Sequence, residues 1–396
     1  MSLRVSVIGG GIGGAATALA LIRAGCDVHV YEQVANKTEV GAGIQVSPNA
    51  TRLLHRYGLA DALRARAVSP SHIEARRWDD GRILSHEELG GSVEAAFGAP
   101  YYHFHRADLL SILIDALPAD RVHTGRRCVD AVQTDDGARA IFDDGSIIDS
   151  DVIVGADGIH SVVRKILFGD EHPRFSGNVA YRGLAPADRV AHLNLRHNAT
   201  NWMGPGGHFV HYFVSGGRFL NFVAVSEQEN WERESWNDRG EIEDAKRCFR
   251  GWHPDIHQIL GAVDETFKWA LFDRAPLSKW SVGRVTLLGD ACHPMLPYMA
   301  QGAAQAIEDG ATLAACLSGI APSGVGEALE KYQQLRRPRT AAIQMAARGN
   351  AMTFHLADGA EQQKRDAEMG SQTGLSPRRA AIFDFDAERL EATPPS

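Results

Sequence analysis

The first 32 residues constrain the fold most, because they read as a strand, a glycine-rich turn, a helix and a second strand in direct succession. An apolar stretch over 1–8 leads into Gly9, Gly11 and Gly14, which fill the glycine positions of the pattern G-x-G-x-x-G. The first glycine permits a tight turn, the second lets the backbone approach a pyrophosphate, and the third lets the helix pack closely on the strand. The segment therefore predicts a βαβ unit that binds a dinucleotide.

The rest of this unit agrees with that interpretation. A helix is expected to start near Gly13 and to be formed mainly by 15–24. Its N-terminal N–H groups and positive dipole end point at the phosphates, so Gly13 is also a candidate cofactor-binding residue. A second strand is expected over 27–31, and Glu32 at its end can accept hydrogen bonds from both ribose hydroxyls of an adenosine. The alternative is a glycine-rich turn in an ordinary βαβ unit, and the order of all these features argues against it.

Composition excludes several classes of protein. The 396 residues are 44% apolar, enough for one large core or two medium ones. The net charge is −8 and no basic stretch could follow a nucleic-acid backbone. The five cysteines are scattered and form no C-x-x-C pair, which is typical of a reducing compartment. No apolar run has the length of a membrane span. We therefore expect a cytoplasmic protein without a nucleic-acid or membrane partner, either a monomer or a homodimer.

The type of strand changes along the chain. Buried strands of the parallel type are expected near the start, at 152–156 and at 284–288, with antiparallel patterns between them. This predicts an α/β fold in which a Rossmann-like nucleotide-binding domain is discontinuous and carries an inserted antiparallel β-sheet domain. We assign 1–72, 101–175 and 274–345 to the nucleotide-binding domain, 73–100 and 176–273 to the β-rich substrate domain, and 346–396 to C-terminal helices and a tail.

Local patterns give more specific expectations. Alternating apolar and polar residues predict antiparallel strands over 71–100. Residues 129–142 are typical of a β-hairpin, and 143–145 (Asp-Asp-Gly) are expected to be its turn. The chain is expected to be mainly helical over 301–355, and the charged tail that follows is expected to be partly unstructured.

Two further motifs follow buried strands. One covers 157–164 and begins with Asp157 and Gly158, and the other covers 289–302 and leads into a helix. With the glycine-rich unit, they resemble the three signatures of the single-component FAD-dependent aromatic hydroxylases, the para-hydroxybenzoate hydroxylase type. The resemblance extends to about Arg339. It implies a Rossmann-like domain of the GR2 type that binds FAD non-covalently.

The resemblance also implies cofactor contacts. Asp290 would contact the ribityl chain, Arg106 the FAD, and Asp157 both the FAD and the nicotinamide cofactor. The loop facing the pyrimidine end of the flavin would be formed by Ala300, Gln301, Gly302 and Ala303. Because the chain has one G-x-G-x-x-G, NADH, or alternatively NADPH, is expected to visit transiently without a Rossmann domain of its own. A helix-capping role for Asp290 and a turn role for Asp157 are the alternatives.

A second set of residues concerns the substrate. Residues 209–214 look like a strand, so His208 and Tyr212 are expected on the same face and His211 on the other. The pair resembles one in the branch of salicylate hydroxylase, 3-hydroxybenzoate 6-hydroxylase and 6-hydroxynicotinate 3-monooxygenase, where the histidine is the base for the substrate hydroxyl and the tyrosine orients the ring. A base suits this chemistry, because a phenolate attacks an electrophilic oxygen far better than a phenol does. The alternative for His208 is a hydrogen-bonded sheet histidine.

Other candidate substrate-binding residues are Gln45, Arg182, Pro297 and Tyr298. Arg182 is a candidate partner for a substrate carboxylate or for the flavin, and the alternative is a structural arginine. Pro297 stands where 3-hydroxybenzoate 6-hydroxylases carry Gln, and Tyr298 stands where the salicylate and 6-hydroxynicotinate enzymes tend to carry His. These departures leave the exact substrate open.

The expected function is O2-dependent hydroxylation of a small hydroxylated aromatic or N-heteroaromatic carboxylate. Decarboxylative hydroxylation of a salicylate-like compound is the first choice, and 6-hydroxynicotinate and 3-hydroxybenzoate are the alternatives. An FAD-dependent dehydrogenase or oxidase and a non-enzymatic FAD-binding module are the other classes. His253 and His257 have the spacing of a helical metal pair but lack a third ligand, so no metal is expected.

Overall fold

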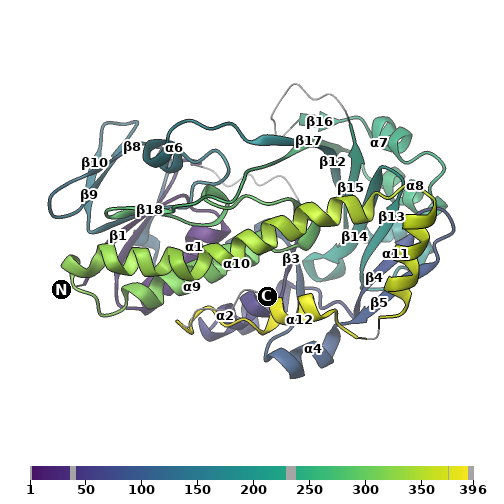
Figure 1. The fold of residues 1–396 in the computed structure, drawn as a ribbon, viewed down its shortest axis with the longest axis horizontal. Coiled ribbons are helices and arrows are strands. Elements are labelled where there is room, and N and C mark those ends of the chain that lie inside the picture. The colour runs from purple at the N-terminus through teal and green to yellow at the C-terminus, as the bar shows by residue number, and fades with distance from the viewer. Residues whose placement is uncertain (1, 36–41, 229–237, 373, 391–396) are drawn as a thin grey trace.

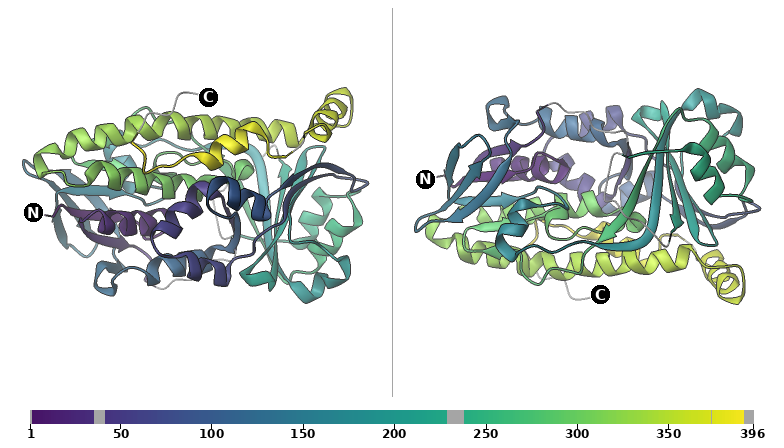
Figure 2. Two further views of the ribbon diagram at one scale, coloured as in Figure 1. Left: turned by 90° about the horizontal axis from the view of Figure 1, so that it is seen from below. Right: turned by 90° about the horizontal axis from the view of Figure 1, so that it is seen from above.

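The computed structural model describes residues 2–35, 42–228, 238–372 and 374–390. A six-stranded sheet lies towards the N-terminal end of the molecule and an eight-stranded sheet towards the other end (Figure 1). Helix α10 (Val325–Phe354) runs along both parts, as the two views of Figure 2 also show. The expected α/β fold with an antiparallel sheet and C-terminal helices is confirmed, whereas the assigned domain boundaries remain a prediction.

The six-stranded sheet forms the nucleotide-binding part. Its order is β18 (Ser281–Val282), β19 (Val285–Leu287), β11 (Val152–Gly155), β1 (Arg4–Ile8), β2 (Asp27–Glu32) and β7 (Val122–Thr124). All pairs are parallel except β18 with β19. Because β1 pairs with β2 on one side and β11 on the other, the strand order reverses at β1. In open α/β sheets, ligands bind at the carboxyl ends of the strands beside such a reversal.

Two helices pack together over this sheet because both carry small residues where they meet. They are α1 (Ile12–Arg23) and α9 (Gly302–Leu317). A Cβ on Gly13 would lie 3.0 Å from the Cβ of Ala306, and a Cβ on Gly310 would lie 2.5 Å from the hydroxyl of Thr17. Larger residues at these glycines would force the helices apart.

The eight-stranded sheet is antiparallel except where β13 pairs with β4. Its order is β16 (Asp238–Gly240), β17 (Thr266–Asp273), β12 (Arg174–Pro186), β15 (Phe219–Glu227), β14 (Gly207–Val214), β13 (Ala199–Gly204), β4 (His72–Arg77) and β5 (Ile83–Glu88). One face packs against α7 (Ile242–Cys248) and α8 (Pro254–Gly261) through an apolar cluster that includes Trp202, Phe209 and Phe222. The alternation of side chains leaves the other face for the cavity described below.

The remaining elements surround these two sheets. They are β3 (Gly43–Val46), which pairs with β6 (Tyr102–His105), the sheet of β8 (Cys128–Gln133), β9 (Ala138–Phe142) and β10 (Ile147–Ser150), and α2 (Pro48–Arg56), α3 (Ala60–Arg66), α4 (Gly90–Phe97), α5 (Arg106–Asp115), α6 (Val162–Phe168), α11 (Ala360–Gly370) and α12 (Pro377–Asp384).

Two local expectations were wrong. Residues 71–100 contain two strands but end in helix α4, because Val93 and Phe97 are four residues apart and pack into one apolar cluster. The turn at 143–145 connects β9 to β10, and the hairpin itself turns at Thr134–Gly137, which carries a similar Asp-Asp-Gly signal. The described part of the tail contains α11 and α12, and Ile382 and Phe383 of α12 are buried beside α4. Residues 373 and 391–396, on which the rest of the tail expectation falls, lie outside the described residues.

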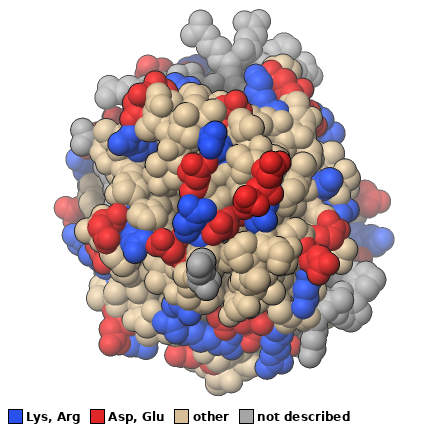
Figure 3. Space-filling view, turned by 90° about the vertical axis from the view of Figure 1, so that its left-hand side faces the viewer, with Lys and Arg blue, Asp and Glu red and all other residues tan. Residues whose placement is uncertain are grey.

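The surface agrees with the charge balance of the sequence. On the face at the left-hand end of Figure 1, positive and negative side chains are interspersed and no large basic area is visible (Figure 3). Among the described residues, no helix combines the length and apolar character that a membrane span needs.

Candidate active site

One large cavity lies between the two sheets and encloses about 1200 Å³. This exceeds the roughly 300–1,000 Å³ of an ordinary small-molecule site. It is lined at one end by the glycine-rich turn and Glu32, in the middle by Asp290 and the start of α9, and at the other end by His208 and Tyr212 of the eight-stranded sheet. The cavity therefore connects the residues expected to bind a cofactor with those expected to bind a substrate.

Each of the three glycines of the first motif lacks a side chain for a different structural reason. Gly9 has a φ of +107°, and a Cβ there would lie 2.4 Å from the carbonyl oxygen of Ala156. A Cβ on Gly14 would lie 1.9 Å from the carbonyl oxygen of Gly9. A Cβ on Gly11, in contrast, would meet no protein atom within 4 Å, although Gly11 lines the cavity. The missing side chain at Gly11 thus keeps space open in front of α1, as a bound pyrophosphate requires.

Glu32 ends β2 beside this turn. One carboxylate oxygen accepts a hydrogen bond from the backbone N–H of Gly10 at 2.7 Å, and the other accepts one from Val34 at 2.8 Å. These bonds hold the carboxylate at the rim of the cavity, where an ionised carboxylate retains further lone pairs for ribose hydroxyls.

The N-terminus of α9 opens into the middle of the cavity. Ala300, just before it, adopts the left-handed region with φ of +51°, a strained conformation for a residue with a side chain. Neither a capping side chain nor an acidic residue satisfies the first turn of α9. The backbone of Ala300, Gln301, Gly302 and Ala303 therefore presents positive partial charge to the cavity, which suits an electron-rich flavin ring.

Gln301 positions this helix through its side chain. The side chain is buried, donates to the hydroxyl of Ser47 at 2.9 Å and accepts from the amide of Asn49 at 3.2 Å. Asn49 also donates to Glu308 at 2.6 Å. The residues that face the cavity from α9 are therefore tied to the start of α2 by a fully buried polar network.

Asp290 and Asp157 differ in what their carboxylates do. Asp290 is exposed to the open cavity, and desolvation by the surrounding protein raises the pKa of its carboxyl. Asp157 accepts hydrogen bonds from the Ser161 hydroxyl and the N–H groups of Val162 and Val163, so its carboxylate caps the N-terminus of α6. Asp157 thus has a capping role that differs from the turn role offered as its alternative, and it also lines the cavity.

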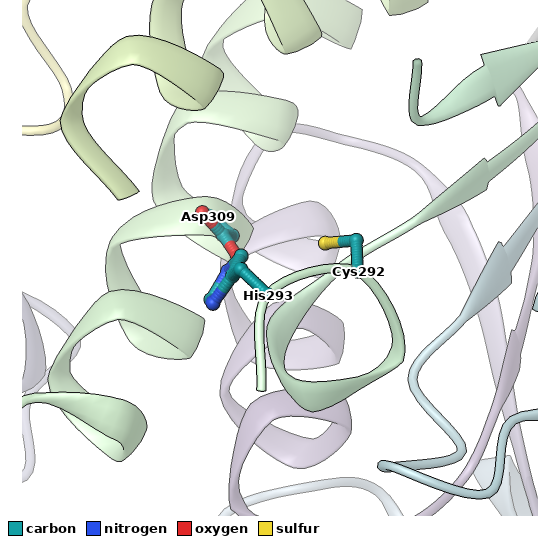
Figure 4. Close-up of side chains that lie close together, drawn as sticks. All are labelled: Cys292, His293 and Asp309. Atoms are coloured by element: carbon teal, nitrogen blue, oxygen red, sulfur yellow. The ribbon is translucent and has the colours of Figure 1, made fainter. Parts of the chain in front are cut away.

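A buried cluster beside Asp290 has the composition of a metal site but serves as an ion-pair network. Cys292, His293 and Asp309 lie together (Figure 4). Asp309 already accepts hydrogen bonds from His293 at 2.6 Å and from Arg336 at 2.7 Å. Burial raises the pKa of the Cys292 thiol well above its usual value, so the thiolate that a metal needs is disfavoured. Arg336 supplies the positive charge that an ion would supply.

The floor of the cavity is one face of the eight-stranded sheet. Paired residues on neighbouring strands form a row across it, namely Arg182, Val223, Val210, Asn201 and Ala75. All five line the cavity. Because side chains alternate along β14, the residues on either side of Val210 that face the cavity are two positions away on each side.

These neighbours of Val210 are His208 and Tyr212, as the sequence predicted, and His211 is buried on the opposite face. The ring of Tyr298 meets His208 edge-on at 4.9 Å between ring centres. Burial and the neighbouring His355 lower the pKa of His208 well below its usual value, so His208 is neutral at neutral pH.

Other predicted substrate residues surround this pair. Gln45 lines the cavity from β3 and accepts a hydrogen bond from the Tyr101 hydroxyl at 2.7 Å. Pro297 and Tyr298 line it from the loop before α9. The hydroxyl of Tyr298 is buried and has no hydrogen-bond partner among the described residues. Because that oxygen has almost no accessible surface, Tyr298 contributes its ring to the cavity wall.

Arg182 is a half-buried cation that lies over the Trp269 ring at 3.7 Å. Burial lowers the pKa of its guanidinium to about 9. Its side chain forms no ion pair or hydrogen bond within the described parts of the chain, and its Nε is buried without a partner. Since an unpaired buried charge is costly, a cavity-facing arginine of this kind is suited to a bound anion. Arg106 also lines the cavity.

Several cavity residues were missed by the sequence-based interpretation. Asn201 lies on the floor with its side-chain oxygen buried and unpartnered, Tyr101 holds Gln45, and Phe383 of α12 lines the far end. His355 bonds to His208 from 147 positions away. The alternation of 199, 201 and 203 in β13 could have indicated Asn201, but no local pattern indicates His355.

Comparison with known proteins decides the family. The model of the family described as "FAD binding domain" matches residues 2–347. This chain belongs to that family. A 3-amino-4-hydroxybenzoate 2-monooxygenase of Streptomyces platensis is 44% identical over 97% of this chain and 96% of its own length. A 6-hydroxynicotinate 3-monooxygenase of Pseudomonas fluorescens is 37% identical, with coverages of 88% and 91%.

A solved structure agrees with these sequence relatives. A salicylate hydroxylase substrate complex superimposes with a TM-score of 0.84 and 27% identity, covering 100% of this chain and 99% of its own. The resemblance to FAD-dependent aromatic hydroxylases is therefore confirmed. The chain is a flavin-dependent aromatic monooxygenase of the branch that the His208 and Tyr212 pair indicated.

Proposed function

We propose that this FAD-binding monooxygenase uses NADH, or alternatively NADPH, and O2 to hydroxylate a small aromatic carboxylate that carries a ring hydroxyl. The observation that carries the proposal is the sheet floor, where His208, Tyr212 and Arg182 face the same cavity as the glycine-rich turn and α9. Arg182 has no ion-pair partner among the described residues. A base, a ring-orienting group and an anion partner are what such a substrate needs.

The described residues fit FAD at the other end of this cavity. The open space at Gly11 would accommodate the pyrophosphate. Glu32, held by the N–H of Gly10, would accept hydrogen bonds from the ribose hydroxyls. Asp290 would contact the ribityl chain, and the uncapped start of α9 would stabilise negative charge on the pyrimidine end of the flavin. FAD, when bound and reduced by the nicotinamide cofactor, supplies an electrophilic oxygen atom derived from O2.

His208 acts as the base. In its neutral form it accepts the proton of the ring hydroxyl, and the resulting phenolate is the stronger nucleophile. Tyr212 and the ring of Tyr298 orient the substrate ring from two sides. The carboxylate pairs with Arg182. The apolar floor at Val210 and Val223 excludes water, which preserves the oxygen donor until the substrate reacts.

An amino-substituted hydroxybenzoate is the substrate class we favour. The relative at 44% identity is named for 3-amino-4-hydroxybenzoate. The side-chain amide of Asn201 lies on the floor between the rows of His208 and Tyr212, where it can hydrogen-bond with a polar ring substituent. Salicylate, with decarboxylation, is the second candidate, supported by the structural match to salicylate hydroxylase.

A substrate panel tests the proposal. The FAD-loaded protein is mixed with NADH and, separately, with 3-amino-4-hydroxybenzoate, 4-hydroxybenzoate, salicylate, 6-hydroxynicotinate, 3-hydroxybenzoate, benzoate and phenol. We expect stimulated NADH oxidation and a hydroxylated product for at least one hydroxy acid, greater turnover of the amino compound than of 4-hydroxybenzoate, no product from benzoate and poor binding of phenol. Equal turnover of phenol and every hydroxy acid would contradict the proposal that Arg182 pairs with the substrate carboxylate. NADH oxidation that yields only H2O2 with every compound would indicate an oxidase instead.

A further inference from the structure

Two residues outside the proposed catalytic set connect His208 to the surface. His355 directly follows α10, and Glu227 ends β15. Nδ1 of His208 lies 2.7 Å from Nε2 of His355, and Nδ1 of His355 lies 3.1 Å from a carboxylate oxygen of Glu227. His208 and His355 are buried, whereas 60% of the Glu227 side chain is exposed. The three side chains form a hydrogen-bonded path from the cavity to solvent.

The chemistry of these bonds determines where each proton sits. An ionised carboxylate can only accept, so Nδ1 of His355 must carry hydrogen. A neutral imidazole has one N–H, so Nε2 of His355 is an acceptor and Nδ1 of His208 is the donor to it. Nε2 of His208 is then unprotonated, and it makes no hydrogen bond within the described residues. Glu227 thus selects the form of His208 that has a basic nitrogen free.

The backbone fixes the outer two residues at one point. In the turn between β13 and β14, the N–H of Gly206 donates to the carbonyl of His355 at 3.1 Å. The carbonyl of Gly206 accepts from the N–H of Glu227 at 2.8 Å. Gly206 needs its positive φ of +66° for this turn. Because β14 begins directly after it, the path is held in register with His208.

We propose that His355 and Glu227 are positioning residues that hold His208 in its basic form and carry the substrate proton out of the cavity. The inference rests on the proposed function of His208. The O–H bond of the ring hydroxyl breaks as N–H forms at Nε2 of His208. The proton on Nδ1 of His208 passes to Nε2 of His355, and the proton on Nδ1 of His355 passes to Glu227 and from there to water. No electrons are exchanged, and the products are a phenolate in the cavity and a proton in solvent.

The electrostatics of the path explain why a relay is needed. Burial and His355 lower the pKa of His208, so a proton is not stored there. Burial also lowers the pKa of His355, but Glu227 acts in the opposite direction and favours a proton on that ring. The other titratable side chain in ring contact with both histidines is Tyr298, whose pKa burial raises, so it is neutral. A proton is therefore more stable on His355, beside Glu227, than on His208, so the path favours movement of the proton towards the surface.

Glu227→Gln and His355→Gln in the full-length, FAD-loaded protein test this inference. An indicator dye in stopped flow reports proton release when 3-amino-4-hydroxybenzoate or salicylate binds, and ultraviolet absorbance reports ionisation of the bound ring hydroxyl across the neutral pH range. We expect proton release to slow by at least about 10-fold, as for other groups that orient a histidine. The phenolate should form at higher pH than in the wild type, while flavin reduction by NADH is unchanged.

The control is Glu94→Gln, the same change at an exposed residue of α4, which should leave both signals at wild-type values. Proton release and ligand ionisation that match the wild type in both path variants would overturn the inference, even if His208→Ala abolishes hydroxylation. If no acid is hydroxylated by the wild type, the proposed function fails, but the ionisation signal still tests the relay. Glu227→Gln, at an exposed side chain, carries the test alone if His355→Gln loses its FAD.

Discussion

Replacement of Gly11 by alanine is expected to weaken FAD binding and to leave the fold intact. Gly11 has an ordinary φ of −69°, and an added Cβ meets no protein atom within 4 Å. The protein alone therefore tolerates alanine. The added methyl group instead fills the space at the start of α1 where a pyrophosphate approaches the backbone. Valine at this position should prevent FAD loading altogether.

The size of the effect follows from the hydrogen bonds that are lost. A hydrogen bond to a charged group contributes about 1.5–3 kcal/mol. If the methyl group displaces the phosphates from one backbone N–H group, FAD binding weakens by about 1.5–3 kcal/mol, which corresponds to roughly 10- to 140-fold in Kd. The stability of the apoprotein should change by less than about 0.5 kcal/mol, because no native contact is altered.

Gly14→Ala is the matched comparison, because a Cβ there would lie 1.9 Å from the carbonyl oxygen of Gly9. Titration of FAD followed by flavin fluorescence gives Kd, and thermal unfolding of the apoprotein gives stability. Gly11→Ala should lose affinity at wild-type stability, and Gly14→Ala should lose stability. Wild-type FAD affinity in Gly11→Ala, or an equal loss of stability in both variants, would refute the reasoning.

Three further outcomes are expected. His208→Ala should slow hydroxylation about 10²–10⁴-fold while NADH oxidation continues and H2O2 replaces the product; hydroxylation at the wild-type rate would make His208 structural. Arg182→Met should weaken the binding of hydroxy acids by about 2–4 kcal/mol in titrations and leave the binding of phenol unchanged. An equal loss of affinity for both ligands would contradict an ion pair between Arg182 and the carboxylate. Burial lowers the pKa values of His103 and His211 to about 3, so the unfolded chain binds more protons below pH 6.5. The free energy of unfolding should therefore fall as pH drops from 6.5 towards 3, by up to about 1.4 kcal/mol per pH unit for each histidine. Urea titrations at several pH values measure this dependence, and a His211→Phe variant with the same pH dependence as the wild type would contradict the prediction.

The parts of the site that the sequence predicts are those built from neighbours in the chain. Gly9, Gly11 and Gly14 are close in sequence, and protein atoms crowd Gly9 and Gly14 whereas Gly11 borders the cavity. The shared face of His208 and Tyr212 follows from the alternation of a strand. These relations depend on local geometry alone.

The remaining features depend on contacts between distant residues. The pair of His208 and His355 joins β14 to the end of α10. The absence of an ion pair at Arg182 within the described residues can be seen only once the surrounding strands are placed. Helix α4 was mistaken for strand because its apolar residues pack against α12, which comes from the far end of the chain.

The fate of the oxygen atoms of O2 tests the central claim most directly. The FAD-loaded protein would be supplied with NADH, isotopically heavy O2 and 3-amino-4-hydroxybenzoate or salicylate, and the products examined by mass spectrometry. An aromatic monooxygenase places one heavy oxygen atom in each new ring hydroxyl and releases the other in water. A ring hydroxyl whose oxygen comes from solvent water, or conversion of all the O2 to H2O2 with every hydroxy acid, would contradict the account.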